Sequence, residues 1–275
     1  MRNSIVLAAA AAIVLLICCD SGTLRSAEGQ TSAKADLPKE LTLDLGSGVK
    51  LDLVLIPAGK FLMGSPLTEA KRDSDETQHE VTISQPFYMG KHLVTQEQYE
   101  KVTGLSPSKY KGAKNPVEKV NWDDAQIFCK KLSTTSGKEV RLPTEAQWEY
   151  ACRAGSTTAY CFGDSDETLD QYAWYSANSK STTHAVGEKK PNAWGLYDMH
   201  GNLWEWCQDL YVDKYYSESP KVDPQGPAKG TGAHVLRGGS WYTSTWDCRS
   251  AYRYWGWPGW HEPYDGFRVV VPAPK

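Results

Sequence analysis

The sequence predicts a mixed domain of strands and helices in which loops outnumber regular elements. Strand and helix patterns are confined to residues 41–155, and regular periodicity fades from Ser156 onward. The chain carries 11 Trp, 15 Tyr and 23 Gly, a composition that favours aromatic side chains packed between loops. Its 275 residues can bury one sizeable core or at most two small ones. We expect metal ions or disulfides to pin such a fold.

The N-terminus predicts export. Arg2 precedes an uninterrupted apolar stretch from Ile5 to Cys19, which is too short for a membrane span and typical of a secretory signal. Its end, "LLICC", resembles a bacterial lipoprotein box with Cys19 as the acylated residue. We interpret residues 1–19 as a signal peptide of lipoprotein type, with simple secretion as the alternative. The mature protein is then expected in the periplasm or cell envelope, or outside the cell.

Residues 20–40 lack aromatic residues and nearly all large apolar ones, which is typical of a flexible linker. The folded domain is therefore expected over 41–275. Its 30 basic and 33 acidic residues are scattered and give a net charge of -3. This pattern excludes a nucleic-acid backbone as the partner, and a membrane is expected to be contacted only through the signal peptide or a lipid anchor.

The first part of the domain predicts strands. Apolar runs at 51–56 and 61–63, joined by Pro57 to Lys60, indicate a hairpin. A polar, acidic stretch over 69–78 separates them from Val81 and Ile83, which alternate with polar neighbours as in a half-buried strand.

Three helices follow, each with a start signal. Thr95 with Gln98 forms a capping-box pair, and Asn121 caps the second helix. The third helix is expected to begin at Thr144 and to end at the left-handed terminator Gly155. The following positions are expected on buried helix faces: Ala125, Phe128, Cys129, Leu132, Trp148, Ala151 and Cys152.

Spacing argues against zinc and against serine hydrolase chemistry. The domain contains no CxxC, HxxxH or HExxH pattern, and "GGSW" lacks the second glycine of a nucleophile elbow. The domain's cysteines are Cys129, Cys152, Cys161, Cys207 and Cys248. Cys129 and Cys152 are expected as buried thiols or as each other's partner. Cys248 could be a reactive thiol, a metal ligand, half of a disulfide with Cys152 or Cys161, or an apolar plug.

The segment "GLYDMHGNLWEWCQDLY" (195–211) combines hard oxygen donors with a flexible backbone. Asp198 and Glu205 offer carboxylates, and Gly201 allows a sharp turn, which suits calcium. The alternative is structural: Asp198 caps a turn, Glu205 pairs with an arginine, and Trp204 and Trp206 lie in the core.

Eight ordered motifs spread over the domain resemble the formylglycine-generating enzyme family, also called the sulfatase-modifying factor family. They are "LVLIPAGKFLMGSP", "YMGKHLVTQEQYE", "VNWDDAQIFCKKLS", "RLPTEAQWEYACRAG", "PNAWGLYDMHGNLWEWCQDLY", "VLRGGSW", "RSAYR" and "GFRVV". The resemblance implies an α+β fold of the C-type-lectin-like kind with little regular secondary structure. It also implies structural calcium, held by the side chains of Asp198 and Glu205 and the backbone oxygens of Gly201 and Leu203, with a second site near Asn178 and Ser179.

The resemblance also defines a catalytic position. Family oxidases convert a substrate cysteine to formylglycine with O2 and a copper(I) ion, held by two cysteines three and eight residues after the serine of a Gly-Gly-Ser motif. Counted from Ser240, these positions are Thr243 and Cys248. A hydroxyl is a poor ligand for soft copper(I), so copper is not expected. We therefore predict a binding or accessory protein, with a formylglycine-generating oxidase that uses Cys248 as the alternative.

The family's substrate groove maps to Arg249, Arg253, Tyr254, Trp255 and Trp257. Aromatic faces there would stack on sugars or prolines, and arginines would bind carboxylate or sulfate groups. The expected partner is a peptide or glycan, or a sulfatase. The alternative is that these aromatic residues only fill a core.

Overall fold

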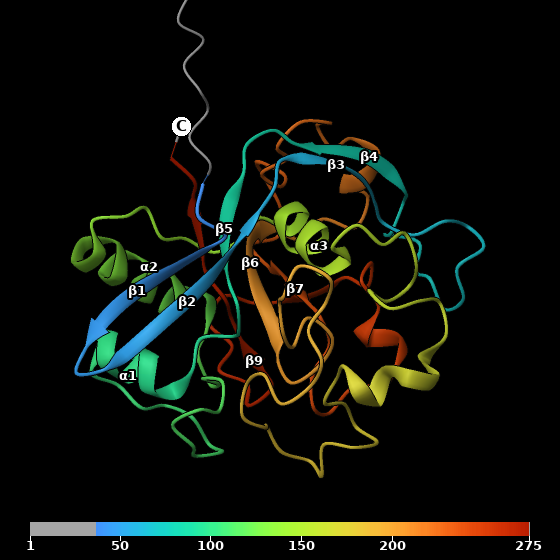
Figure 1. Ribbon diagram of the computed structural model, residues 1–275. Helices are drawn as coiled ribbons and strands as arrows, with labels where there is room; N and C mark the ends of the chain where they lie inside the picture. Colours follow the sequence, from blue (N-terminus) through green and yellow to red (C-terminus); the bar gives the residue numbers. More distant parts are fainter. Residues whose placement is uncertain (1–36, 275) are drawn as a thin grey trace, which may run out of the picture. The chain divides into compact units, whose positions relative to one another are not determined.

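The computed structural model describes residues 37–274 of the chain (Figure 1). The predicted signal peptide, Cys19 and residues 20–36 of the predicted linker lie outside this range. Within the described residues, no helix has the length and apolar character needed to cross a membrane. The first strand, β1 (Glu40–Gly46), begins close to the predicted start of the domain.

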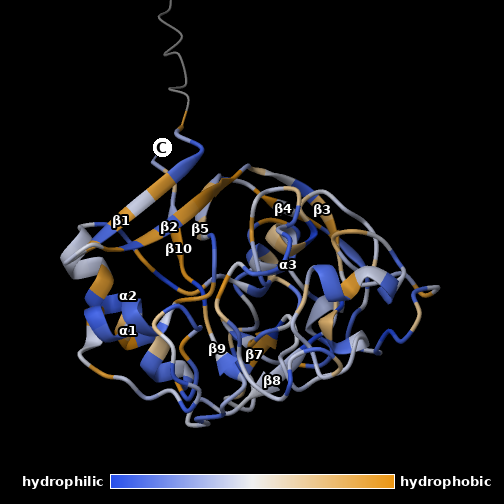
Figure 2. Cartoon of the chain, turned by 60° about the horizontal axis from the view of Figure 1, so that its bottom comes forward, coloured by the Kyte–Doolittle hydropathy of each residue, from blue (hydrophilic) through white to orange (hydrophobic). Residues whose placement is uncertain are grey.

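A four-stranded antiparallel sheet joins the two ends of the domain. Its strand order is β1-β2-β5-β10, with β2 at Val49–Ile56, β5 at Phe87–Gly90 and β10 at Val270–Pro272. Because β10 pairs with β5, both ends of the described chain lie at one end of this sheet (Figure 1). Figure 2 shows hydrophobic colour on these strands, and helices α1 and α2 pack against β1.

The predicted hairpin between 51–56 and 61–63 is wrong. Strand β3 (Gly59–Met63) pairs with β4 (His79–Ile83) and forms a separate two-stranded sheet. Strand β2 already has β1 on one edge and β5 on the other, so it has no free edge for β3. The half-buried strand predicted at Val81 and Ile83 is confirmed, since both residues are buried in β4.

The helix starts are confirmed by complete capping boxes at Thr95, Asn121 and Thr144. The helices are α1 (Gln96–Thr103), α2 (Trp122–Ser136) and α3 (Glu145–Arg153). Helix α3 ends one residue earlier than expected, because Ala154 takes the left-handed conformation with φ 47° before Gly155 does. The predicted faces of α2 and α3 are buried, and Trp148, Phe128 and Cys152 are among their most enclosed residues.

The loop-rich C-terminal half contains a sheet that periodicity does not reveal. Its strand order is β8-β7-β6-β9, with β6 at Trp204–Leu210, β7 at His234–Arg237, β8 at Tyr254–Gly256 and β9 at Asp265–Gly266. Strand β6 is buried on both faces over most of its length, so its side chains do not alternate in polarity. Helix α3 packs against β3, β6 and β7, which places it between the two-stranded sheet and the C-terminal four-stranded sheet (Figure 1).

Buried arginine–carboxylate pairs pin the loops, instead of the expected disulfides. They join Arg153 and Arg237 to Glu149, Arg249 to Glu76, Arg253 to Glu145, and Arg268 to Glu205. Glu149 on α3 also accepts the backbone N–H of Gly64 at 2.9 Å. Gly64 has φ 86°, and a Cβ there would meet the carbonyl oxygen of Glu76 at 2.6 Å, so glycine is required at this contact.

We predict that Glu149→Gln strongly destabilises the domain. The substitution leaves Arg153 and Arg237 buried with less opposite charge, and breaking such a pair costs about 3–5 kcal/mol. Urea unfolding followed by tryptophan fluorescence measures the loss. The control is Glu80→Gln, because the Lys60–Glu80 pair is exposed and is expected to contribute little. Equal unfolding midpoints for the two variants would contradict the role of the buried pairs.

Candidate functional site

The loop from Thr243 to Arg249 lies at the centre of the candidate site. It begins after Gly238 and Gly239, which have φ of 95° and 76°. A Cβ at Gly239 would meet the sulfur of Cys248 at 2.7 Å, so two glycines let the backbone turn tightly over this thiol. Thr243 folds back onto Ser240, whose N–H donates to the Thr243 hydroxyl at 2.9 Å.

The structure brings Thr243 and Cys248 together. Burial and the charge of Asp247 raise the pKa of the Cys248 thiol, while the neighbouring Thr243 side chain lowers it by less. Cys248 is fully buried. The positions counted from Ser240 are therefore neighbours in space, as a pair of metal ligands would be. One of them is an oxygen, and the other is a protonated thiol.

Histidine and thiol groups surround Cys248 without forming a disulfide. All five cysteines of the described domain are free, so of the alternatives for Cys248 the disulfide with Cys152 or Cys161 is wrong, and Cys248 is a buried free thiol. The His200 Nδ1–H donates to the carbonyl oxygen of Cys248 at 2.7 Å, and its Nε2 accepts the N–H of Cys161 at 3.2 Å. These two bonds fix the ring orientation of His200, which is buried.

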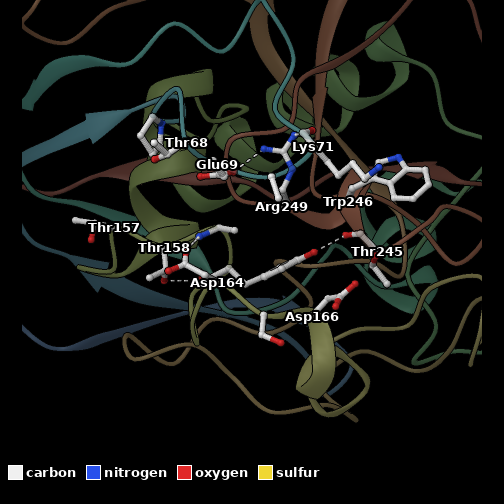
Figure 3. Close-up of a pocket in the computed structure, with 15 residues that line it drawn as sticks. Thr68, Glu69, Lys71, Thr157, Thr158, Asp164, Asp166, Thr245, Trp246 and Arg249 are labelled. Atoms are coloured by element: carbon white, nitrogen blue, oxygen red, sulfur yellow. Dashed lines mark hydrogen bonds and ion pairs between the residues drawn. The ribbon is translucent and has the colours of Figure 1, made fainter.

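A cavity of about 710 Å³ lies on one side of the loop (Figure 3). Trp246, which is 46% exposed, lines it together with the carboxylates of Asp164 and Asp166. Arg249 reaches its wall but bonds Glu69 at 2.6 Å and Glu76 at 2.7 Å. The other lining residues are Pro66, Thr68, Ala70, Lys71, Thr157, Thr158, Ala159, Tyr160, Ser165 and Thr245.

A smaller cavity of about 250 Å³ lies on the other side of the loop. It is lined by Trp204, Tyr242, Thr243, Ser244, Asp247, Tyr252, Tyr254 and Tyr264. Of these residues, the sequence analysis named only Thr243 and Tyr254 as functional positions. It gave Trp204 as part of the calcium-binding segment or, alternatively, of the core. The residues it missed sit next to the motifs "GGSW", "RSAYR" and "GFRVV", and that adjacency is the signal that could have revealed them.

Of the residues expected to line the substrate groove, the arginines are buried and two tryptophans are exposed. The side chain of Arg253 is fully enclosed and bonds Glu145 at 2.8 Å, so it offers no surface to a ligand and its expected groove role is corrected. Arg249 is 2% exposed and neutralised by Glu69 and Glu76. Trp255 and Trp257 are exposed at 36% and 41%, and both line an apolar cavity of about 430 Å³.

The acidic stretch 69–78 supplies the partners of these arginines, which the sequence analysis did not foresee. The carboxylates of Asp73, Asp75 and Glu76 lie within 4.8 Å of one another and could hold a metal ion. Two of them already have other partners, because Glu76 bonds Arg249 and Asp75 accepts the hydroxyl of Tyr211 at 2.9 Å.

The predicted calcium positions have protein partners as well. Both oxygens of Glu205 accept from Arg268, at 2.6 and 2.7 Å, and a calcium ion would compete with that arginine. Asp198 accepts the N–H of Gly187 at 2.9 Å, and burial raises its pKa to about 6. As placed, Glu205 does not fit the donor set expected with Asp198, Gly201 and Leu203, and calcium binding stays a prediction.

Asn178 and Ser179, the positions of the second expected calcium site, hold loops together. The side-chain oxygen of Asn178 accepts the N–H of Tyr175 at 2.8 Å, and its amide donates to the carbonyl of Ala173. The hydroxyl of Ser179 donates to the carbonyl of Trp241 at 2.6 Å. These bonds tie the loop to the segment that follows Ser240.

Comparison with known proteins identifies the family. The model of the sulfatase-modifying factor enzyme 1-like domain matches residues 49–273. The chain therefore belongs to this family, and the predicted α+β, loop-rich, C-type-lectin-like fold is confirmed. Two solved structures are similar to this chain over 100% of their own length. Treponema denticola variable protein 1 has a TM-score of 0.80 and 32% sequence identity, and covers 86% of this chain. PvdO from Pseudomonas aeruginosa has a TM-score of 0.79 and 29% sequence identity, and covers 87% of this chain.

Curated relatives carry different names. A serine/threonine-protein kinase pkn1 of Chlamydia pneumoniae is 35% identical over 80% of this chain and 38% of its own length. A formylglycine-generating enzyme of Streptomyces coelicolor is 40% identical over 46% of this chain and 42% of its own. The chaperone protein LppX of Paenibacillus barcinonensis is 30% identical over 80% of this chain and 89% of its own length. The chain spans about two fifths of the length of the first two relatives.

We predict that Cys248 is inert in the folded protein. Reaction with iodoacetamide requires an accessible thiolate, and Cys248 is enclosed with a raised pKa. Among the described cysteines, only Cys161 is not buried, so peptide mapping after native labelling should find the label there. All five should react after unfolding in urea. Labelling of native Cys248 as fast as Cys161 would contradict its enclosure.

Proposed function

We propose that this domain binds a peptide or glycan at the larger cavity beside the Thr243–Arg249 loop and does not oxidise cysteine. The observation that carries the proposal is the pairing of Thr243 with Cys248. Copper(I) prefers soft thiolate ligands, and the structure offers a hydroxyl at one position and a buried thiol with a raised pKa at the other. Family oxidation chemistry therefore lacks its metal ligands in this chain.

The larger cavity supports ligand binding. Trp246 presents an exposed ring at its edge, and the Nζ of Lys71 lies 5.5 Å from that ring's centroid. Hydroxyl groups and the carboxylates of Asp164 and Asp166 surround the space, as Figure 3 shows. An aromatic face with several polar side chains around it is suited to the recognition of sugars or of extended peptides.

The relatives support a role other than oxidation. Proteins named as kinases and as a chaperone contain a similar domain, so the fold is present in proteins that are not named as oxidases. An accessory role beside a protein partner, such as a sulfatase, is compatible with this distribution. We also propose that the protein is exported and held at the cell envelope through Cys19, as its first 19 residues predict.

Copper binding and peptide oxidation test the proposal. We expect the wild-type protein to leave a Cys-x-Pro-x-Arg peptide unmodified in mass spectrometry after incubation with copper and O2. Thr243→Cys should bind one copper(I) ion in competition with a chelator, because it places a second thiol beside Cys248. The control is Thr245→Cys, which introduces a thiol into the same loop away from that pair. Formylglycine formation by the wild type would overturn the proposal in favour of the oxidase.

The ligand is tested separately with glycan and peptide arrays. We expect binding to a subset of one array, and at least a tenfold weakening by Trp246→Ala, because the exposed ring is removed from the larger cavity. Trp246 makes no core contact that the fold requires, since it is exposed. Absence of any ligand from both arrays would contradict the binding proposal.

A further inference from the structure

The smaller cavity has the chemistry of a cation site. We propose that it binds the head group of an alkylammonium compound, a binding function beyond the one proposed above for the larger cavity. The cavity combines a small volume of about 250 Å³, aromatic walls and one acidic side chain, Asp247. Its lining includes no lysine, arginine or histidine.

Aromatic rings line the cavity in two groups. Trp204 stacks on Tyr254 with ring centroids 5.0 Å apart and lies 5.9 Å from Tyr252. Tyr242 stacks on Tyr264 at 5.2 Å. The faces of such rings carry negative electrostatic potential and attract cations, and quaternary ammonium groups are bound by aromatic cages of this kind. Rings in two groups suit a rounded head group better than the flat plane of a guanidinium.

The polar groups of the loop are already engaged. The Thr243 hydroxyl accepts from the N–H of Ser240 and donates to its carbonyl. Asp247 Oδ2 accepts from both the N–H and the hydroxyl of Ser244, at 2.9 and 2.5 Å. The remaining hydroxyl groups of the lining are those of Tyr242, Tyr252, Tyr254 and Tyr264, which belong to the rings themselves. An alkylammonium needs only ring faces and negative charge, which these residues still provide.

A second acid lies close to the cavity. Asp265 is fully buried, and neither carboxylate oxygen has a hydrogen-bond partner among the described residues. Burial and the charge of Glu262 raise the pKa of Asp265 well above its ordinary value, and the residue directly follows Tyr264, which lines the cavity. A buried carboxyl group without partners is unfavourable, and a cation in the cavity would reduce that penalty. Asp265 does not itself line the cavity, so the proposal rests on the rings and on Asp247.

The nearby guanidinium of Arg249 does not cancel the negative electrostatic potential of the smaller cavity. The guanidinium of Arg249 lies 5.7 Å from the ring centroid of Tyr252. Its charge is balanced by Glu69 and Glu76. Arg249 lines the larger cavity and is absent from the lining of the smaller one.

Calorimetric titration with choline and with 3,3-dimethyl-1-butanol tests the proposal. The alcohol has nearly the same shape as choline but no charge. We expect choline to bind at least about tenfold more tightly, which is the factor that cation–π attraction supplies in a partly desolvated site. Equal affinities, tighter binding of methylguanidinium than of choline, or no choline binding would overturn the proposal.

Variants locate the site. Tyr242 is 57% exposed, so replacing it should not unfold the domain. Tyr242→Leu should weaken choline binding about tenfold, whereas Tyr242→Phe, which keeps the ring face, should retain it. The matched control is Trp260→Leu, an exposed aromatic residue outside both cavities of the loop, and it should bind choline as the wild type does. Loss of binding in the control but not in Tyr242→Leu would place the cation elsewhere and overturn the assignment.

Two further measurements separate the origins of the ligand and the two proposals. Co-sedimentation with phosphatidylcholine vesicles but not phosphatidylglycerol vesicles would identify a lipid head group, while binding of free choline alone would identify a small molecule, and both support an alkylammonium site. Array ligands that bind while choline does not would overturn this inference and leave the proposed function intact. Formylglycine formation would overturn the proposed function whether or not choline binds.

Discussion

Buried pairing of arginine with carboxylate is the interaction on which the rest of this structure depends. Arg237, from β7, and Arg153 meet at Glu149 inside α3, and Arg268 holds Glu205 on β6. Enclosing such charges is unfavourable unless each is paired and hydrogen-bonded. The pairs meet this condition with bonds near 2.6 to 2.8 Å, and they join loops that have little regular structure of their own.

The same pairs shape the functional surface. Arg249 ties the loop that carries Cys248 to Glu69 and Glu76, which lie 180 and 173 positions earlier in the chain. That connection holds the wall between the larger and the smaller cavity. It also explains why the arginines of "RSAYR" are not free to bind an anionic ligand. Burial would raise the pKa of Glu145, but the charges of Arg253 and Arg237 outweigh it and lower the value, so this carboxylate stays charged inside the domain.

The sequence analysis was correct for features that depend on residues close together in the sequence. The capping residues Thr95, Asn121 and Thr144 gave correct helix starts because a cap satisfies backbone groups within three residues. Counting from Ser240 places Thr243 and Cys248 in one short loop, and their role as a pair stays a prediction. The hairpin failed because strand partners are chosen by free edges across the whole fold, and β6 was missed because burial on both faces removes alternation. The partners of Arg249 and Arg253 lie far along the sequence, so no spacing rule could identify them.

The central claim is that paired charges, rather than disulfides, hold this loop-rich domain together. Urea unfolding of the mature domain with and without a reducing agent tests it most directly. The account predicts the same free energy of unfolding in both conditions, because the described cysteines are free thiols. A loss of about 2 kcal/mol or more on adding the reducing agent, the size expected for removing a structural disulfide, would contradict it.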